Sequence, residues 1–153
     1  MNIYTLFGVG ILSICLPMFL PDVSGPALYD VLHDRCPPLP VYLPDILLAL
    51  TSLYVIWLDE FSGLQVEKVV ACLAIRAFTC SATRLPTPVP KEPWRSQHDL
   101  MFSGHTVCFM ALADVINGTF GAVVRWVFPV TLILARQHYT SDVLVAMAIF
   151  HGV

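Results

Sequence analysis

The chain has 153 residues, of which 57% are hydrophobic and only 12% are charged, and its formal net charge is -3. A soluble domain carries about 25% charged residues, so this composition is typical of a membrane protein. The length fits one domain, which we expect to cover residues 1–153. The small negative charge and the scattered basic residues argue against binding to nucleic acid.

Apolar segments along the chain predict an all-α fold, a polytopic membrane bundle of about six transmembrane helices. The segments are Ile3–Leu20, Leu43–Leu58, Val66–Ala82, Gly104–Ile116, Thr119–Ala135 and Tyr139–Gly152. The first lacks the basic start and the small-residue cleavage site of a signal peptide, so we expect it to remain as a helix. Several segments are shorter than the ~20 residues that span a bilayer, and we expect flanking polar residues to extend them. The Asn117-Gly118 pair predicts the turn between the fourth and fifth segments.

Three ionisable side chains stand where predicted helices begin. His105 opens the fourth segment, and His138 and Asp142 open the sixth. The two predicted helices that begin with these residues start on the same side of the bundle. A His and an Asp at i and i+4 share one helix face, so the carboxylate can orient the imidazole and leave its other nitrogen as a nucleophile or base. Ionisable side chains in membrane segments are costly and mark functional sites, and helix N-termini favour a bound phosphate.

Simpler interpretations of these residues remain open. A single His at a helix start is usually a cap or a surface residue. Two His and an Asp could also hold zinc, although the basic residues nearby would repel a cation. The five cysteines are odd in number and fit no zinc spacing. We therefore expect no metal and no cofactor.

The chain also carries four short motifs in order. They are Pro37-Pro38-Leu39-Pro40, then Arg76 with Thr83-Arg84-Leu85-Pro86-Thr87-Pro88, then Gln97-His98-Asp99 with Ser103-Gly104-His105-Thr106, and finally His138-Tyr139-Thr140-Ser141-Asp142-Val143. In these motifs the chain resembles the sphingomyelin synthase family, a branch of the type 2 phosphatidic acid phosphatase superfamily. It departs from the family pattern at Val41, where the family has an Asp, although Asp45 follows. The Cys and Gly that accompany the family's third motif are also absent.

The resemblance implies a phospholipid head-group transferase. His138 would attack the phosphorus of a glycerophospholipid and release diacylglycerol, leaving a phospho-head group (phosphocholine or similar) on the imidazole. Asp142 would orient His138, and His105 would act first as acid and then as base for the acceptor, ceramide. The partners would be these membrane lipids. The family places the site on the lumenal or extracellular side, whereas a count of basic residues favours the cytoplasm.

Five further residues are candidates for binding the phosphate or head group, namely Arg76, Ser103, Gly104, Arg136 and Asp99. Arg76 lies well inside an apolar segment and could instead snorkel or pair with a carboxylate. Asp99 could bind a head-group amine, cap the fourth helix or face water. Asp114 is expected to form a structural ion pair with Arg125 or Arg76. His33, Asp34 and Arg35 are expected to be solvated loop residues.

The nearest alternative function is a lipid phosphate phosphatase that uses water as acceptor. The related phosphatases carry an Arg six residues before the second His, where this chain has Leu132, and a Lys-x6-Arg-Pro motif that is missing here. Their absence favours transfer of a head group over hydrolysis of a phosphate monoester. A lipid-binding or scaffolding protein without catalysis is a third possibility, against which the intact set of His105, His138 and Asp142 argues.

Overall fold

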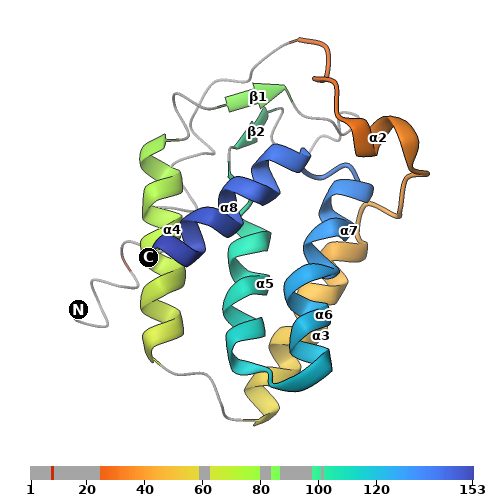
Figure 1. The fold of residues 1–153 in the computed structure, drawn as a ribbon. Coiled ribbons are helices and arrows are strands. Elements are labelled where there is room, and N and C mark those ends of the chain that lie inside the picture. The colour runs from red at the N-terminus through yellow and green to blue at the C-terminus, as the bar shows by residue number, and fades with distance from the viewer. Residues whose placement is uncertain (1–7, 9–24, 59–62, 80–83, 87–97, 101) are drawn as a thin grey trace.

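The computed structural model describes residue 8 and residues 25–58, 63–79, 84–86, 98–100 and 102–153, and most of these are helical (Figure 1). The first predicted segment, Ile3–Leu20, lies outside the described residues except for Gly8. The elements are α2 (Val31–Arg35), α3 (Leu43–Leu58), α4 (Gly63–Thr79), β1 (Arg84–Pro86), β2 (His98–Leu100), α5 (Gly104–Val115), α6 (Gly118–Trp126), α7 (Phe128–Leu134) and α8 (Thr140–Gly152).

Helices α3, α4, α5 and α8 confirm four predicted segments, in the case of α3 with the same bounds. The predicted helix over Thr119–Ala135 is divided at Val127 into α6 and α7, although Val127 itself keeps helical dihedrals (φ -88°, ψ -43°). Pro129, in the first turn of α7, explains the break. Proline has no N–H to donate, and its ring clashes with the carbonyl four residues earlier, so a continuous helix is unfavourable there.

Helix α5 forms the centre of the bundle and contacts α3, α4, α6, α7 and α8 (Figure 1). One apolar cluster joins α5 to α3, α6, α7 and α8, and includes Val55, Phe109 and Leu132, each fully buried. A second joins α5 to α4 and α8 through Cys72, Met110 and Phe150. Helix α5 is therefore held from several sides, and the residues at its ends have well-fixed positions.

The predicted turn between α5 and α6 is confirmed at Asn117-Gly118. Gly118 has a φ of 76°, a left-handed conformation that glycine adopts without strain. Gly121 approaches the preceding helix so closely that an added Cβ would stand 1.9 Å from the Ile116 carbonyl oxygen. Helices α5 and α6 consequently pack as a tight antiparallel pair.

Two features differ from a bundle of six membrane helices. Strands β1 and β2, which were not predicted, pair antiparallel with Leu85 opposite Asp99. In the part of the chain that the structure describes, no helix combines the length and the hydropathy that a membrane span requires, and the longest, α4, has 17 residues. The coarse all-α architecture is confirmed, and the number of spans stays a prediction.

Candidate active site

The starts of α5 and α8 lie at the same end of the bundle, next to α2 and the two strands (Figure 1). The backbone joins them directly, because the Ser103 N–H donates to the Asp142 carbonyl at 3.3 Å. This bond connects the residue before α5 to the first turn of α8. His105 and His138, which are 33 positions apart in sequence, therefore face each other with their ring centroids 6.5 Å apart.

Asp142 occupies the first turn of α8 and is fully buried. Its Oδ2 accepts the Tyr139 N–H at 2.9 Å, which fixes the carboxylate at the helix start. The same oxygen lies 3.7 Å from His138 Nδ1. That distance suits an ion pair but is longer than a hydrogen bond. The carboxylate thus faces one edge of the imidazole. The predicted shared helix face is wrong, however, because α8 begins at Thr140 and His138 precedes its N-cap, Tyr139.

His105 is more open, with 34% of its side chain exposed. Its Nε2 lies 2.9 Å from Oδ1 of Asp45, which stands in the first turn of α3. Oδ2 of the same carboxylate accepts a hydrogen bond from Gln137 Nε2, also at 2.9 Å. Gln137 is buried, and its amide donates to the Val41 carbonyl as well. Each histidine therefore has its own carboxylate, and that of His105 comes from another helix.

Asp30 supports the start of α8 from the other side. It is the N-cap of α2, where one of its oxygens accepts the Leu32 N–H. It also accepts the Thr140 N–H at 2.6 Å and the Thr140 hydroxyl at 2.9 Å. Burial opposes ionisation of this carboxyl, but the hydrogen bonds from Thr140 and Leu32, together with the nearby His33, outweigh it and lower the pKa of Asp30.

The prediction that His33 is a solvated loop residue is wrong. Its side chain is buried, its Nε2 lies 3.2 Å from the His138 carbonyl oxygen, and its ring packs beside Tyr139. Arg136 reaches the same turn of chain, since its guanidinium donates to the His33 carbonyl at 2.8 Å. Helix α2 is therefore fastened to the loop that carries His138. Asp34 and Arg35 are exposed, as predicted.

Arg76 projects from α4 toward the start of α5. Its Nε donates to the Phe102 carbonyl at 2.7 Å, and its Nη1 is 3.8 Å from the Cβ that a side chain at Gly104 would have. The guanidinium thus lies against the residue that precedes His105. Ser103 is fully buried and is the N-cap of α5, with its hydroxyl accepting the Thr106 N–H. Since Ser103 is the cap, Asp99 in β2 is not, and the side chain of Asp99 lies outside the described atoms.

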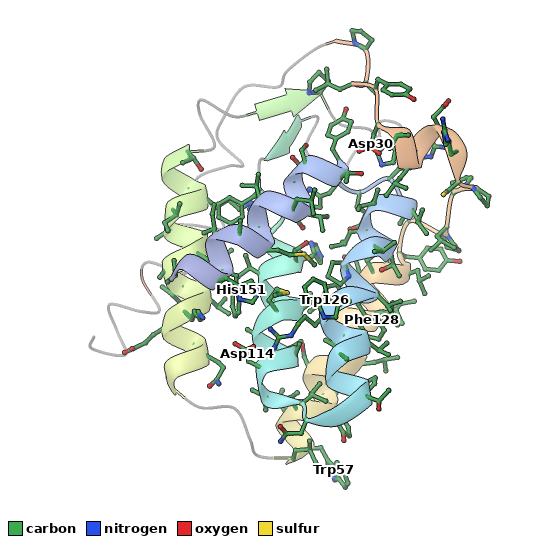
Figure 2. All side chains as sticks on the ribbon, in the orientation of Figure 1. Asp30, Trp57, Asp114, Trp126, Phe128 and His151 are labelled. Atoms are coloured by element: carbon green, nitrogen blue, oxygen red, sulfur yellow. The ribbon has the colours of Figure 1, made fainter. Side chains whose placement is uncertain are left out.

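Asp114 and Arg125 form an ion pair between α5 and α6, which confirms the expected structural partner of Asp114. Figure 2 shows Asp114 toward the opposite end of the bundle from Asp30. The pair is therefore remote from the two histidines.

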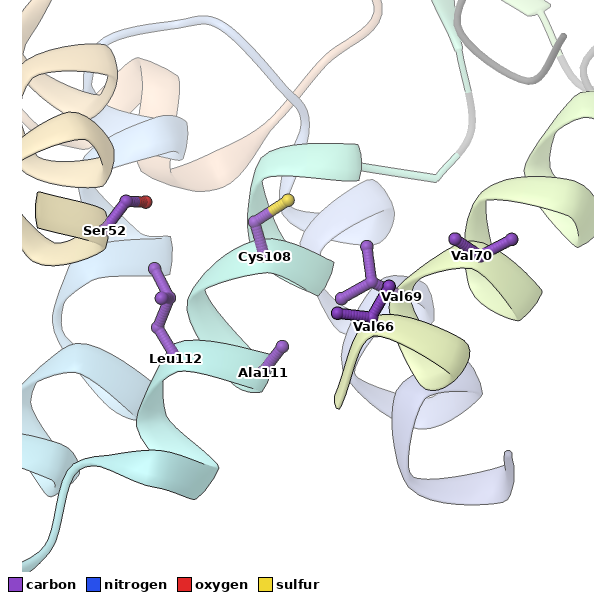
Figure 3. A pocket seen from close by; sticks show the side chains of 7 residues that line it. All are labelled: Ser52, Val66, Val69, Val70, Cys108, Ala111 and Leu112. Carbon is purple, nitrogen blue, oxygen red and sulfur yellow. The ribbon is translucent and has the colours of Figure 1, made fainter. Parts of the chain in front are cut away.

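An apolar cavity of about 190 Å³ lies among α3, α4 and α5. Valines of α4 and Ala111 and Leu112 of α5 line most of it, with Ser52 on the α3 side (Figure 3). Cys108, about one helical turn beyond His105, also lines the cavity. Among the described residues, no group of three or more His, Cys, Asp or Glu side chains is arranged to hold a metal ion.

Sequence reasoning did not assign roles to Asp30, Asp45, Gln137 or His33. Asp45 carried a usable signal, because it follows the Pro-rich motif and begins a helix on the same side as His105. Asp30 also carried one, as an Asp directly before a short helical stretch. No local sequence signal marked Gln137 or His33, because their contacts link segments that are about a hundred residues apart.

Residues 98–153, which include His105, His138 and Asp142, match the family described as PAP2 superfamily C-terminal. The predicted resemblance to the phosphatidic acid phosphatase superfamily is confirmed for this part of the chain. The chain is also similar to a phosphatidylinositol:ceramide inositolphosphotransferase of Trypanosoma cruzi (strain CL Brener), with 39% identity over 62 residues. That alignment covers 33% of this chain and 18% of the relative, so the similarity spans less than a fifth of the relative's length.

Proposed function

We propose that this chain transfers a phospho-head group from a glycerophospholipid to ceramide through a phospho-histidine at His138. One observation carries the proposal. Two histidines face each other at 6.5 Å, each has a carboxylate beside it, and both lie in the segment that matches the phosphatase superfamily. A nucleophile, its orienting acid and a second proton carrier are the groups that a two-step transfer requires.

In the first step, Nε2 of His138 attacks the phosphorus while the bond from phosphorus to the diacylglycerol oxygen breaks. His105 gives a proton to the departing oxygen, and diacylglycerol leaves. In the second step, the ceramide hydroxyl passes its proton to His105 as its oxygen attacks the phosphorus, and the phosphorus–nitrogen bond breaks. Asp142 stabilises the positive charge on His138 in the intermediate. Both histidines return to their starting protonation states.

Charge on the phosphoryl oxygens needs donors that are already in place. We propose Arg76 and the backbone N–H of Gly104, at the start of α5, for this role. Ser103 would act by holding that helix start as its cap. Arg136 and Asp99 would contact the head group, which requires Arg136 to exchange its bond with His33 for one with the ligand.

The name of the relative suggests the acceptor and the head group. The Trypanosoma cruzi protein is named for transfer from phosphatidylinositol to ceramide. We therefore propose ceramide as acceptor and inositol phosphate as the first head group to test, beside the phosphocholine that the motif resemblance implies.

The surface of the bundle supports a lipid environment. The exposed fractions of Ile56, Trp57 and Trp126 are 69%, 77% and 59%. Large apolar side chains with this much exposure are typical of contact with lipid, and tryptophan favours the membrane interface. The apolar cavity lined by Cys108 suits an acyl chain. We propose that the chain is a multi-pass membrane protein whose site opens to the lumenal or extracellular side.

The test is a lipid assay on the full chain in membranes. Donors with labelled inositol, choline or ethanolamine head groups are supplied with and without ceramide, and products are separated by chromatography. A new phosphosphingolipid and diacylglycerol that appear only with ceramide support transfer. Release of the phosphate group without ceramide indicates the phosphatase alternative. His138→Ala should abolish turnover, whereas Asp34→Asn, a change at an exposed carboxylate, should not. Unchanged turnover in His138→Ala would falsify the enzyme proposal.

A further inference from the structure

We infer that Asp45 is the positioning residue of His105, and that it fixes which ring nitrogen carries the proton in the transfer. The inference rests on the proposed function, in which His105 is the acid and then the base. It assigns Nε2–H of His105 to Asp45 and leaves Nδ1 as the atom that exchanges a proton with the lipid oxygen.

The geometry that supports this begins with the 2.9 Å contact between His105 Nε2 and Asp45 Oδ1. A carboxylate only accepts hydrogen bonds, so the nitrogen that faces it must be the protonated one. A bond at one ring nitrogen determines the tautomer and therefore the chemistry available at the other. Asp142 lies 3.7 Å from Nδ1 of His138, beyond hydrogen-bond distance, so the two carboxylates face different ring nitrogens of their histidines.

A single exposed ion pair would hold His105 weakly. Half of the Asp45 side chain is exposed, and such pairs contribute little because water and side-chain entropy compete with them. Gln137 changes this, because its buried amide holds Oδ2 of Asp45 at 2.9 Å and is itself fixed to the Val41 carbonyl. The carboxylate thus has one oxygen on a rigid amide and the other on His105. Gln137 adjoins His138, so one side chain connects the proton carrier to the loop of the nucleophile.

The alternative is that the contact between Asp45 and His105 only fastens α3 to α5. The two interpretations differ in their dependence on the leaving group. An alkoxide leaves poorly without an acid, whereas a thiolate leaves readily because thiols are much stronger acids than alcohols. A donor phospholipid whose bridging oxygen to glycerol is replaced by sulfur needs no proton from His105 in the first step. It keeps the same head group and acyl chains, so we expect it to bind at the same site.

The test compares Asp45→Asn with the unmodified chain on the oxygen donor and on the sulfur donor. The asparagine amide can donate to Nε2 and so favours the wrong tautomer of His105. We expect kcat on the oxygen donor to fall by about 10²-fold, in the range of general acid–base effects, with KM changed little. On the sulfur donor, the rate of the first burst of thiol release by Asp45→Asn should be within about threefold of the rate of the unmodified chain. Asp34→Asn is the matched control and should behave as the unmodified chain on both donors.

Equal losses on both donors would overturn the inference in favour of a structural role, and so would full activity of Asp45→Asn on the oxygen donor. A double-mutant cycle with His105→Ala gives a second reading, because Asp45→Asn should cause no further loss once His105 is absent. If Asp45→Asn fails to fold, Gln137→Leu is used instead. It leaves both charges in place and should show the same recovery on the sulfur donor. Turnover that survives in His138→Ala would contradict the proposed function itself. The comparisons of Asp45→Asn on the two donors test only the role of Asp45.

Discussion

Asp30 accepts two hydrogen bonds from Thr140, one from its backbone N–H and one from its hydroxyl, across 110 positions of sequence. Thr140 is the first residue of α8, and its neighbours His138 and Asp142 are the proposed nucleophile and its orienting acid. The free N–H groups of a helix start need acceptors. Asp30 supplies one from outside the helix and thereby fixes the start of α8 relative to α2.

Replacing Asp30 by Asn should weaken this connection. Asparagine keeps one oxygen acceptor but loses the second acceptor and the charge. We expect the free energy of unfolding to fall by roughly 1–3 kcal/mol, because hydrogen bonds to a charged group are lost and donors at the helix start are left unsatisfied. Chemical denaturation of the purified chain measures this, with Asp34→Asn as the exposed control. A loss no larger than that of the control would show that α8 is held by packing alone.

The same pair makes a prediction about pH. The pKa of Asp30 is lowered from its usual value of 3.8 in the folded chain, so folding favours the ionised form. A carboxyl of this kind contributes stability above its unfolded pKa, and that contribution is lost as pH falls through the folded pKa. We expect the difference in unfolding free energy between the unmodified chain and Asp30→Asn to be constant near neutral pH and to shrink below about pH 4. A difference that stays the same down to pH 2 would contradict the assignment.

Local sequence patterns predict the parts of this site that are local. The apolar run of α3 and the turn at Gly118 follow from periodicity and turn chemistry within a few residues. The short separation of His138 and Asp142 likewise brings these two side chains together, although His138 precedes α8. Contacts between Asp45 and His105, or between Asp30 and Thr140, depend on how whole helices are placed against each other. Periodicity contains no information about that placement. The break before Pro129 was local, yet the strong apolar pattern around it concealed the effect of the proline.

Two contacts of Asp142 can be separated by substitution. Its Oδ2 accepts the Tyr139 N–H and also faces His138 Nδ1. Asparagine can still accept the backbone N–H but carries no charge, whereas alanine does neither. We expect Asp142→Asn to reduce kcat by about 10²–10⁴-fold with little effect on thermal unfolding. Asp142→Ala should lose a similar fraction of activity and also unfold at a lower temperature. Equal activity in the unmodified chain and Asp142→Asn would remove the orienting role from Asp142.

The cavity beside Cys108 predicts a dependence on acyl-chain length. Ser52→Phe would place a ring in this space from the α3 side. If the cavity accepts an acyl chain, KM should rise severalfold for long-chain donors and remain near its original value for short-chain donors, because only the long chain competes with the ring. Leu53→Phe is the matched control, since Leu53 is the next residue, is 62% exposed and does not line the cavity. Parallel loss on both donor lengths would point to distortion of α3 instead.

The ion pair between Asp114 and Arg125 provides a prediction of no effect on chemistry. It joins α5 to α6 toward the end of the bundle away from the histidines, and both side chains are partly exposed. Pairs of this kind contribute about 0–1 kcal/mol, because solvation competes with the attraction between the charges. Asp114→Asn should therefore lower stability by less than about 1 kcal/mol and leave kcat and KM unchanged. If Asp114→Asn reduced turnover tenfold while the chain remained folded, Asp114 would have a role in function. Reversal of the pair, with Asp114→Arg and Arg125→Asp together, should then fail to restore activity, whereas a purely structural pair should tolerate the exchange.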